Sequence, residues 1–136
     1  MEQTLIIIGA SIFGLLGTLH LIFTLFTNRF EAYDPIVTEA MKSTSPILTK
    51  ETTIWNAWVG FNASHSLGAM LVAGFYIPLT LWYFDVIQQS AWFSNLPVLI
   101  GIFYLILAKK YWFKIPFVGI LISTVCFIAA AILINT

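Results

Sequence analysis

The chain has 136 residues, of which 60% are hydrophobic and only 9% are charged, and its mean hydropathy is +0.93. Soluble domains are about 45–50% apolar and about 25% charged, so this composition predicts an integral membrane protein and excludes an ordinary soluble domain. Six basic and six acidic residues give a net charge of zero, which excludes the basic surface expected of a nucleic-acid-binding protein. The single cysteine, Cys126, excludes an intrachain disulfide.

Four apolar stretches approach the roughly 20 residues that a membrane-spanning helix needs. They predict spans at about residues 5–26, 54–77, 92–110 and 116–134. No basic residue precedes the first stretch, which is also longer than the apolar part of a signal peptide, so we expect it to be a retained span. The sequence therefore predicts one all-α transmembrane domain over residues 1–136, an antiparallel four-helix bundle.

The segment between the first two spans predicts a short helix of its own. Asp34 followed by Pro35 is a typical helix start, with Asp as the N-cap and Pro at the first helical position. Apolar residues then share one face, which predicts an amphipathic helix at the membrane interface: Ile36, Val37, Ala40 and Met41. Ser45-Pro46 repeats the start signal, so the second long helix is expected to begin at Pro46. Pro78 is expected to kink or end that helix.

Basic residues predict how the chain is oriented in the membrane. All of them lie in or at the edges of the first and third connections: Arg29, Lys42, Lys50, Lys109, Lys110 and Lys114. The positive-inside rule places both connections in the cytoplasm and both termini outside it.

Small residues recur on the first two spans at spacings that let helices approach closely. The residues expected to lie in helix contacts are Gly14, Gly17, Gly60, Ser64 and Gly68.

Two histidines lie well inside the first two spans, where a polar side chain needs a partner or a function. His20 precedes Arg29 by nine residues, and His65 follows Trp55 by ten. At 1.5 Å per residue, both lie about 13–15 Å from the cytoplasmic interface. Because the two helices are consecutive and both residues lie near small-residue faces, we expect the imidazoles to face each other.

Polar and aromatic neighbours of this pair predict a ligand pocket in the membrane. The expected lining is His20, His65, Asn62, Trp58, Thr24, Ser66, Trp55 and Tyr76. A purely structural role is the alternative, in which the imidazoles bond to nearby hydroxyls or amides and hold the helices together. Ser64 and Ser66 adjoin His65 but point about 100° away from it, so no Ser–His catalytic pair is indicated.

A cofactor is the third possibility that the histidines leave open. His20 and His65 could ligate haem b from both sides or help to bind a metal ion. No His-x-x-His, Glu-x-x-His or Cys-x-x-Cys motif supports a metal site. A proton or ion path through such short helices would require an oligomer.

Two motifs resemble those of a family of uncharacterised small four-span bacterial membrane proteins. They are H-L-I-F-T from His20 to Thr24 and W-N-A-W-V-G-F-N-A-S-H-S-L-G from Trp55 to Gly68. The resemblance covers the first two spans and their connection. It implies a helical bundle in the bacterial inner membrane and no particular activity. We therefore expect a non-catalytic protein that binds a small apolar ligand, a lipid or a protein partner, as a homo-oligomer or as a subunit of a larger membrane complex.

Overall fold

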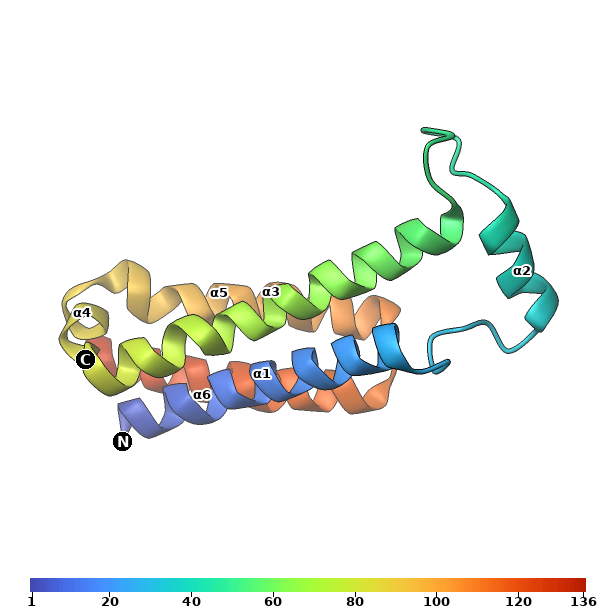
Figure 1. The fold of residues 1–136 in the computed structure, drawn as a ribbon. Helices are drawn as coiled ribbons and strands as arrows, with labels where there is room; N and C mark the ends of the chain where they lie inside the picture. Colours follow the sequence, from blue (N-terminus) through green and yellow to red (C-terminus); the bar gives the residue numbers. More distant parts are fainter. The chain divides into compact units, whose positions relative to one another are not determined.

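A computed structural model describes all residues, Met1–Thr136, and they form helices joined by a longer loop on each side of α2 (Pro35–Ser43) and by short connections elsewhere (Figure 1). The helices are α1 (Glu2–Phe26), α2 (Pro35–Ser43), α3 (Ile54–Trp82), α4 (Phe84–Gln89), α5 (Ala91–Tyr111) and α6 (Lys114–Asn135). Four of them, α1, α3, α5 and α6, are long and apolar enough to cross a membrane. The all-helical fold is confirmed, and the four candidate spans are those of a multi-pass membrane protein.

The short helix α2 begins where the sequence predicts. Asp34 is its N-cap, and the Asp34 carboxylate accepts a 2.9 Å hydrogen bond from the backbone N–H of Ile36. Pro35 occupies the first helical position, where its missing N–H costs nothing. The helix ends at Ser43, and the N–H of Thr44 bonds to the carbonyl of Ala40.

The start of α3 was predicted wrongly. It begins at Ile54 rather than at Pro46, because the threonines before it form local side-chain bonds that compete with helix formation. The N–H of Glu51 donates to the hydroxyl of Thr49, and the N–H of Asn56 donates to the hydroxyl of Thr53, which caps the helix.

At its other end α3 runs past Pro78 to Trp82 instead of stopping at about residue 77. Proline is tolerated in spanning helices where neighbouring groups satisfy the polar atoms that it leaves. The sequence did not predict α4, which follows directly and buries Ile87 completely. Ser90 then caps α5, which begins one residue before the expected Trp92.

The chain divides into two compact units, and α1 and α3 each contribute to both. The larger unit comprises Met1–Leu16 and Ala69–Thr136, and the smaller unit comprises Gly17–Gly68. An apolar core fills the larger unit, and its largest fully buried aromatic side chains are Phe13, Tyr76 and Phe127. The Phe13 ring packs edge-on against Tyr104 of α5, with ring centroids 5.1 Å apart.

Small residues let the helices of the larger unit approach closely. A Cβ added at Gly14 would lie 2.7 Å from the Cβ of Ala73, so α1 and α3 are in near-backbone contact there. The hydroxyl of Ser123 in α6 donates to the carbonyl of Gly9 in α1 at 2.7 Å. Helices α5 and α6 run side by side (Figure 1), and a Cβ at Gly101 would meet Thr124 at 2.6 Å. Gly14 is one of the residues that the sequence expects in helix contacts, and it lies against Ala73 of α3.

Two of the other residues predicted to pack do not do so within this chain. A Cβ at Gly60 would meet nothing within 4 Å, and Ser64 is exposed, with its hydroxyl bonded to the carbonyl of Phe61 in its own helix. Gly17 is buried and Gly68 is half-buried. A four-residue repeat identifies one face of a helix, but it does not show whether a neighbour lies against that face.

Replacing Gly14 with Ala should destabilise the fold, because the new methyl group would collide with a Cβ that the backbone holds in place. We expect a loss of about 1–3 kcal/mol, as for overpacked sites generally. Gly60→Ala is the matched control and should change stability by less than about 0.5 kcal/mol, since it fills open space. Thermal unfolding of both variants in detergent measures the difference, and equal effects would contradict the packing described.

Candidate functional site

The smaller unit contains the polar cluster that the sequence predicts. The Nε2 atom of His20 in α1 lies 3.0 Å from the Oδ1 atom of Asn62 in α3, within hydrogen-bond distance. The His20 and His65 rings have centroids 5.6 Å apart and planes inclined at 74°. The prediction that the two imidazoles meet is confirmed.

The bonds of Asn62 determine which His20 nitrogen carries the proton. The Asn62 Nδ2 atom donates to the carbonyl of Trp58 at 2.8 Å, so the amide oxygen is the atom that faces His20. An amide oxygen only accepts, so Nε2 of His20 carries a hydrogen and donates it. In the neutral imidazole the other nitrogen, Nδ1, is then a hydrogen-bond acceptor.

An aromatic ring from the α1–α2 connection packs against His20. The Phe30 ring lies against His20 with centroids 4.5 Å apart, and the backbone carbonyl of Phe30 accepts a 3.2 Å bond from Trp58 Nε1. Phe30 was not among the predicted site residues. It lies in an irregular segment, where no helical period indicates which way a side chain points, and the only signal was its aromatic character.

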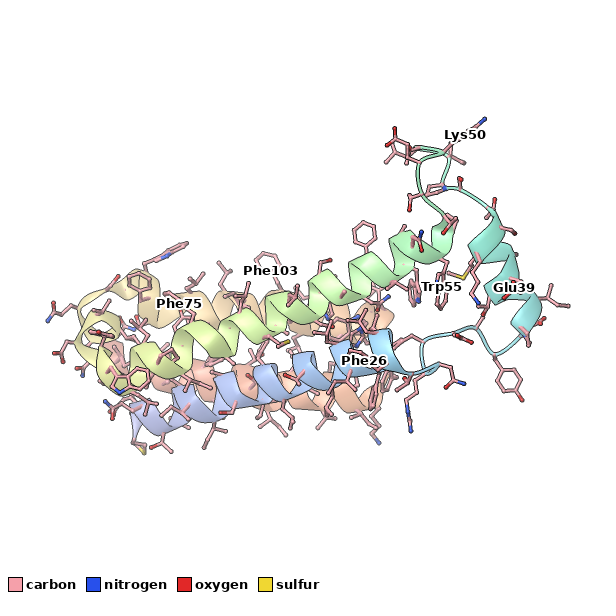
Figure 2. The ribbon with its side chains drawn as sticks, in the orientation of Figure 1. Phe26, Glu39, Lys50, Trp55, Phe75 and Phe103 are labelled. Carbon is pink, nitrogen blue, oxygen red and sulfur yellow. The ribbon has the colours of Figure 1, made fainter.

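Three of the residues predicted to line the pocket contact groups other than the two imidazole rings. The Thr24 hydroxyl donates to the backbone carbonyl of His20 at 2.8 Å, and the fully buried Ser66 hydroxyl donates to that of Asn62, also at 2.8 Å. Trp55 lies at the start of α3 beside α2 (Figure 2), with the Lys42 Nζ atom 5.5 Å from its ring centroid. Thr24 and Ser66 thus stabilise the helices that position the ring and the amide, while Trp55 contacts α2.

Tyr76 is in a different place from the one predicted. It follows His65 by eleven residues along α3, about 16 Å at 1.5 Å per residue, and belongs to the larger unit. Its side chain is 1% exposed, and its hydroxyl donates to the carbonyl of Phe93 at 3.1 Å. The sequence predicted Tyr76 as lining of the histidine pocket and could not show that its hydroxyl bonds to α5.

The cluster offers few ligands to the cofactors that the sequence left open. A haem iron between the imidazoles would need a ring nitrogen from each, and because Nε2 of His20 donates to Asn62, Nδ1 is the nitrogen of His20 that would have to ligate it. A non-haem metal site usually needs three or four ligands. No group of three or more His, Cys, Asp or Glu side chains is close enough to hold an ion.

Comparisons of the chain with models of protein families, with curated proteins and with solved structures found no match.

A double-mutant cycle on His20→Ala and Asn62→Ala should detect the bond between these side chains. Polar contacts between spanning helices have coupling energies that average about 0.6 kcal/mol and reach about 1.7 kcal/mol, so we expect a value in that range. Unfolding of the single and double variants in mixed micelles measures it.

Ser64→Ala is the control for this cycle, because its hydroxyl bonds only within its own helix. Combined with Asn62→Ala it should show additive effects. Additive effects for His20 and Asn62 as well would mean that the two side chains do not interact.

Proposed function

We propose that this chain is a non-catalytic protein of the bacterial inner membrane that binds a small apolar ligand or a lipid at the cluster of His20, Asn62 and His65. The observation that carries the proposal is the His20–Asn62 hydrogen bond, because it uses the donor of the imidazole and leaves its acceptor available. The two motifs that resemble the four-span bacterial family contain all three residues.

The Nδ1 atom of His20 is the contact point proposed for the ligand. Every buried side-chain nitrogen or oxygen in the structure has a hydrogen-bond partner, and the structure pairs His20 through Nε2. The proposal assigns the other ring nitrogen, Nδ1, to the ligand. An acceptor within a lipid bilayer gains most from a donor that water does not supply there.

Ligand chemistry follows from this acceptor and its surroundings. Phe30 and Trp58 give the cluster apolar walls, and binding sites for small molecules typically combine such walls with a few polar groups. A molecule that carries one hydroxyl or amine donor on an apolar body satisfies both requirements. Long-chain alcohols and lipids with donor headgroups belong to this class.

A binding role accounts for the cluster better than catalysis does. Residues 54–82, which form α3, contain no Asp or Glu that could orient His65 as a general base. The hydroxyl of Ser66 is buried and donates to its own helix, while Ser64 lies on an exposed face. Neither serine is arranged as a nucleophile next to a base.

The same proposal includes an antiparallel bundle of the four long helices, with the α2 loop and the short α5–α6 connection in the cytoplasm. Its support is the distribution of the six basic residues, which all lie in or at the edges of these two connections. Both termini, and Asp85 in α4, are then outside the cytoplasm.

Labelling of single cysteines tests this orientation. In a Cys126→Ala background, Asp85→Cys should react with a membrane-impermeant maleimide on intact spheroplasts. Lys50→Cys should react only after lysis, because its loop faces the cytoplasm. Both native residues are exposed, so accessibility to the reagent is limited by the membrane. The reverse pattern would contradict the orientation.

Photolabelling tests ligand binding. A diazirine derivative of hexadecanol in vesicles should label residues near the cluster, and excess hexadecanol should compete while hexadecyl methyl ether, which has no donor, should not. His20→Phe removes the acceptor and should reduce labelling by about two- to tenfold, because one hydrogen bond contributes about 0.5–1.5 kcal/mol.

Ser64→Ala should label as the native chain does, because Ser64 lies on an exposed face. Equal competition by the alcohol and the ether, or unchanged labelling of the His20→Phe variant, would contradict the proposed ligand class. A haem absorption spectrum in the purified protein would favour the cofactor alternative instead.

A further inference from the structure

The loop between α2 and α3 is closed at both ends by a backbone hydrogen bond. The N–H of Ile54, the first residue of α3, donates to the carbonyl of Thr44 at 2.9 Å. This bond holds the two ends of the loop formed by residues 45–53 together at the start of α3. Lys50 lies at the outer end of this loop in Figure 2.

Apolar side chains project from this loop. Ile47 is fully exposed, and Leu48 is 94% exposed. The residues that follow, Thr49, Lys50 and Glu51, are polar. Two adjacent branched apolar side chains held away from the protein are unfavourable in water, because their surface stays hydrated.

Helix α2 buries one polar residue, Thr38, and leaves its branched apolar residues exposed beside Glu39 and Lys42. Thr38 is 4% exposed, and its hydroxyl accepts a 3.1 Å bond from the N–H of Ala32. Ile36 is 77% exposed, and Tyr33, just before the helix, is fully exposed. Exposed apolar side chains next to charged ones are typical of a helix that lies at a membrane interface, where the apolar groups enter the lipid and the charged groups stay in water.

The position of residues 33–48 between two candidate spans indicates that the apolar side chains meet the membrane. It connects the end of α1 at Phe26 to the start of α3 at Ile54, and both helices are candidate spans. Trp55 and Trp58 lie in the first two turns of α3, where the helix enters the lipid, and aromatic residues of this kind are typical of the membrane interface. Residues 33–48 are therefore held next to the bilayer that the helices cross.

Charge shows which kind of lipid contact is involved. Residues 27–53 contain three basic and four acidic side chains, which gives 3 − 4 = −1. Attraction to anionic headgroups is not the cause, because the segment is slightly acidic itself. The contact depends on apolar burial among the lipids.

We propose that Tyr33, Ile36, Ile47 and Leu48 insert into the lipid interface of the membrane that the protein spans, so that α2 and the loop after it anchor the smaller unit to the bilayer surface. The proposal does not depend on a ligand at His20. It extends the expected interfacial position of α2 to residues 46–48, which the sequence had placed in the second long helix.

Nitroxide accessibility tests the insertion. In a Cys126→Ala background, Ile47→Cys, Leu48→Cys and Glu51→Cys are each spin-labelled, and the protein is placed in phosphatidylcholine nanodiscs at one copy per disc. At positions 47 and 48, collisions with oxygen, which concentrates in lipid, should exceed those with a water-soluble nickel chelate several-fold. At position 51, in the same loop, the ratio should be reversed.

Two outcomes would overturn the proposal. Labels at 47 and 48 that collide with the nickel chelate as often as the label at 51 would show that the loop lies in water. Low collision rates with both reagents would show that protein covers these side chains. Ile47→Cys and Leu48→Cys each alter one of the four apolar residues and Glu51→Cys alters none, so at least three still hold the segment while it is measured.

Discussion

The structure depends on one constraint, that polar side chains inside a bilayer must find their hydrogen-bond partners within the protein. Most hydroxyl groups in the helices find a hydrogen-bond partner in the backbone of their own helix. Those of Thr24, Ser66, Thr80 and Thr124 each donate to the carbonyl four residues earlier in the same helix. Such bonds give the hydroxyl a partner but do not join one helix to another. The few side-chain hydrogen bonds between helices therefore do most to fix how the helices face each other.

Side-chain bonds between long helices occur at separate points along them. In the larger unit Ser123 bonds to the carbonyl of Gly9, Tyr76 bonds to that of Phe93, and Asn135 bonds to the hydroxyl of Ser94. In the smaller unit His20 bonds to Asn62. Packing of Leu and Ile against neighbours discriminates weakly between rotations of a helix in lipid, whereas each of these bonds requires one particular rotation. The His20–Asn62 bond differs from the others because it leaves a ring nitrogen as an acceptor, and this difference is the basis of the proposed binding site.

The two units are stabilised in different ways. The larger unit buries a continuous apolar cluster, and glycines allow close approach where α1 meets α3 and α6 and where α5 meets α6. The smaller unit relies on the histidine cluster, on Phe30 and on the contacts between α2 and the start of α3. Sites that bind ligands are commonly built from a few polar groups held by such irregular segments, and the proposed site lies within residues 17–68.

Local patterns accounted for most of the secondary structure. Hydropathy over windows of about 20 residues identified the four spans, because burial of backbone polar groups in lipid leaves the helix as the form such a stretch can take. Asp34-Pro35 identified the start of α2, since capping involves only neighbouring residues. Ser45-Pro46 failed as a start signal because Thr49 and Thr53 offered the backbone alternative bonds. Helix α4 was missed because six residues are too short to show a period.

The sequence by itself determined that this chain is helical, that it crosses a membrane, and that His20 and His65 lie at similar distances along consecutive spans, because composition and the rise of a helix do not depend on distant contacts. Only the tertiary structure decided that Asn62 takes the donor of His20, that Phe30 packs on that ring, and that Tyr76 bonds to α5 instead. It also decided that Gly14 is a packing residue while Gly60 is not. These outcomes depend on which helix lies against which face, and the rotation and neighbours of a helix are set by the whole chain and cannot be read from the period of one segment.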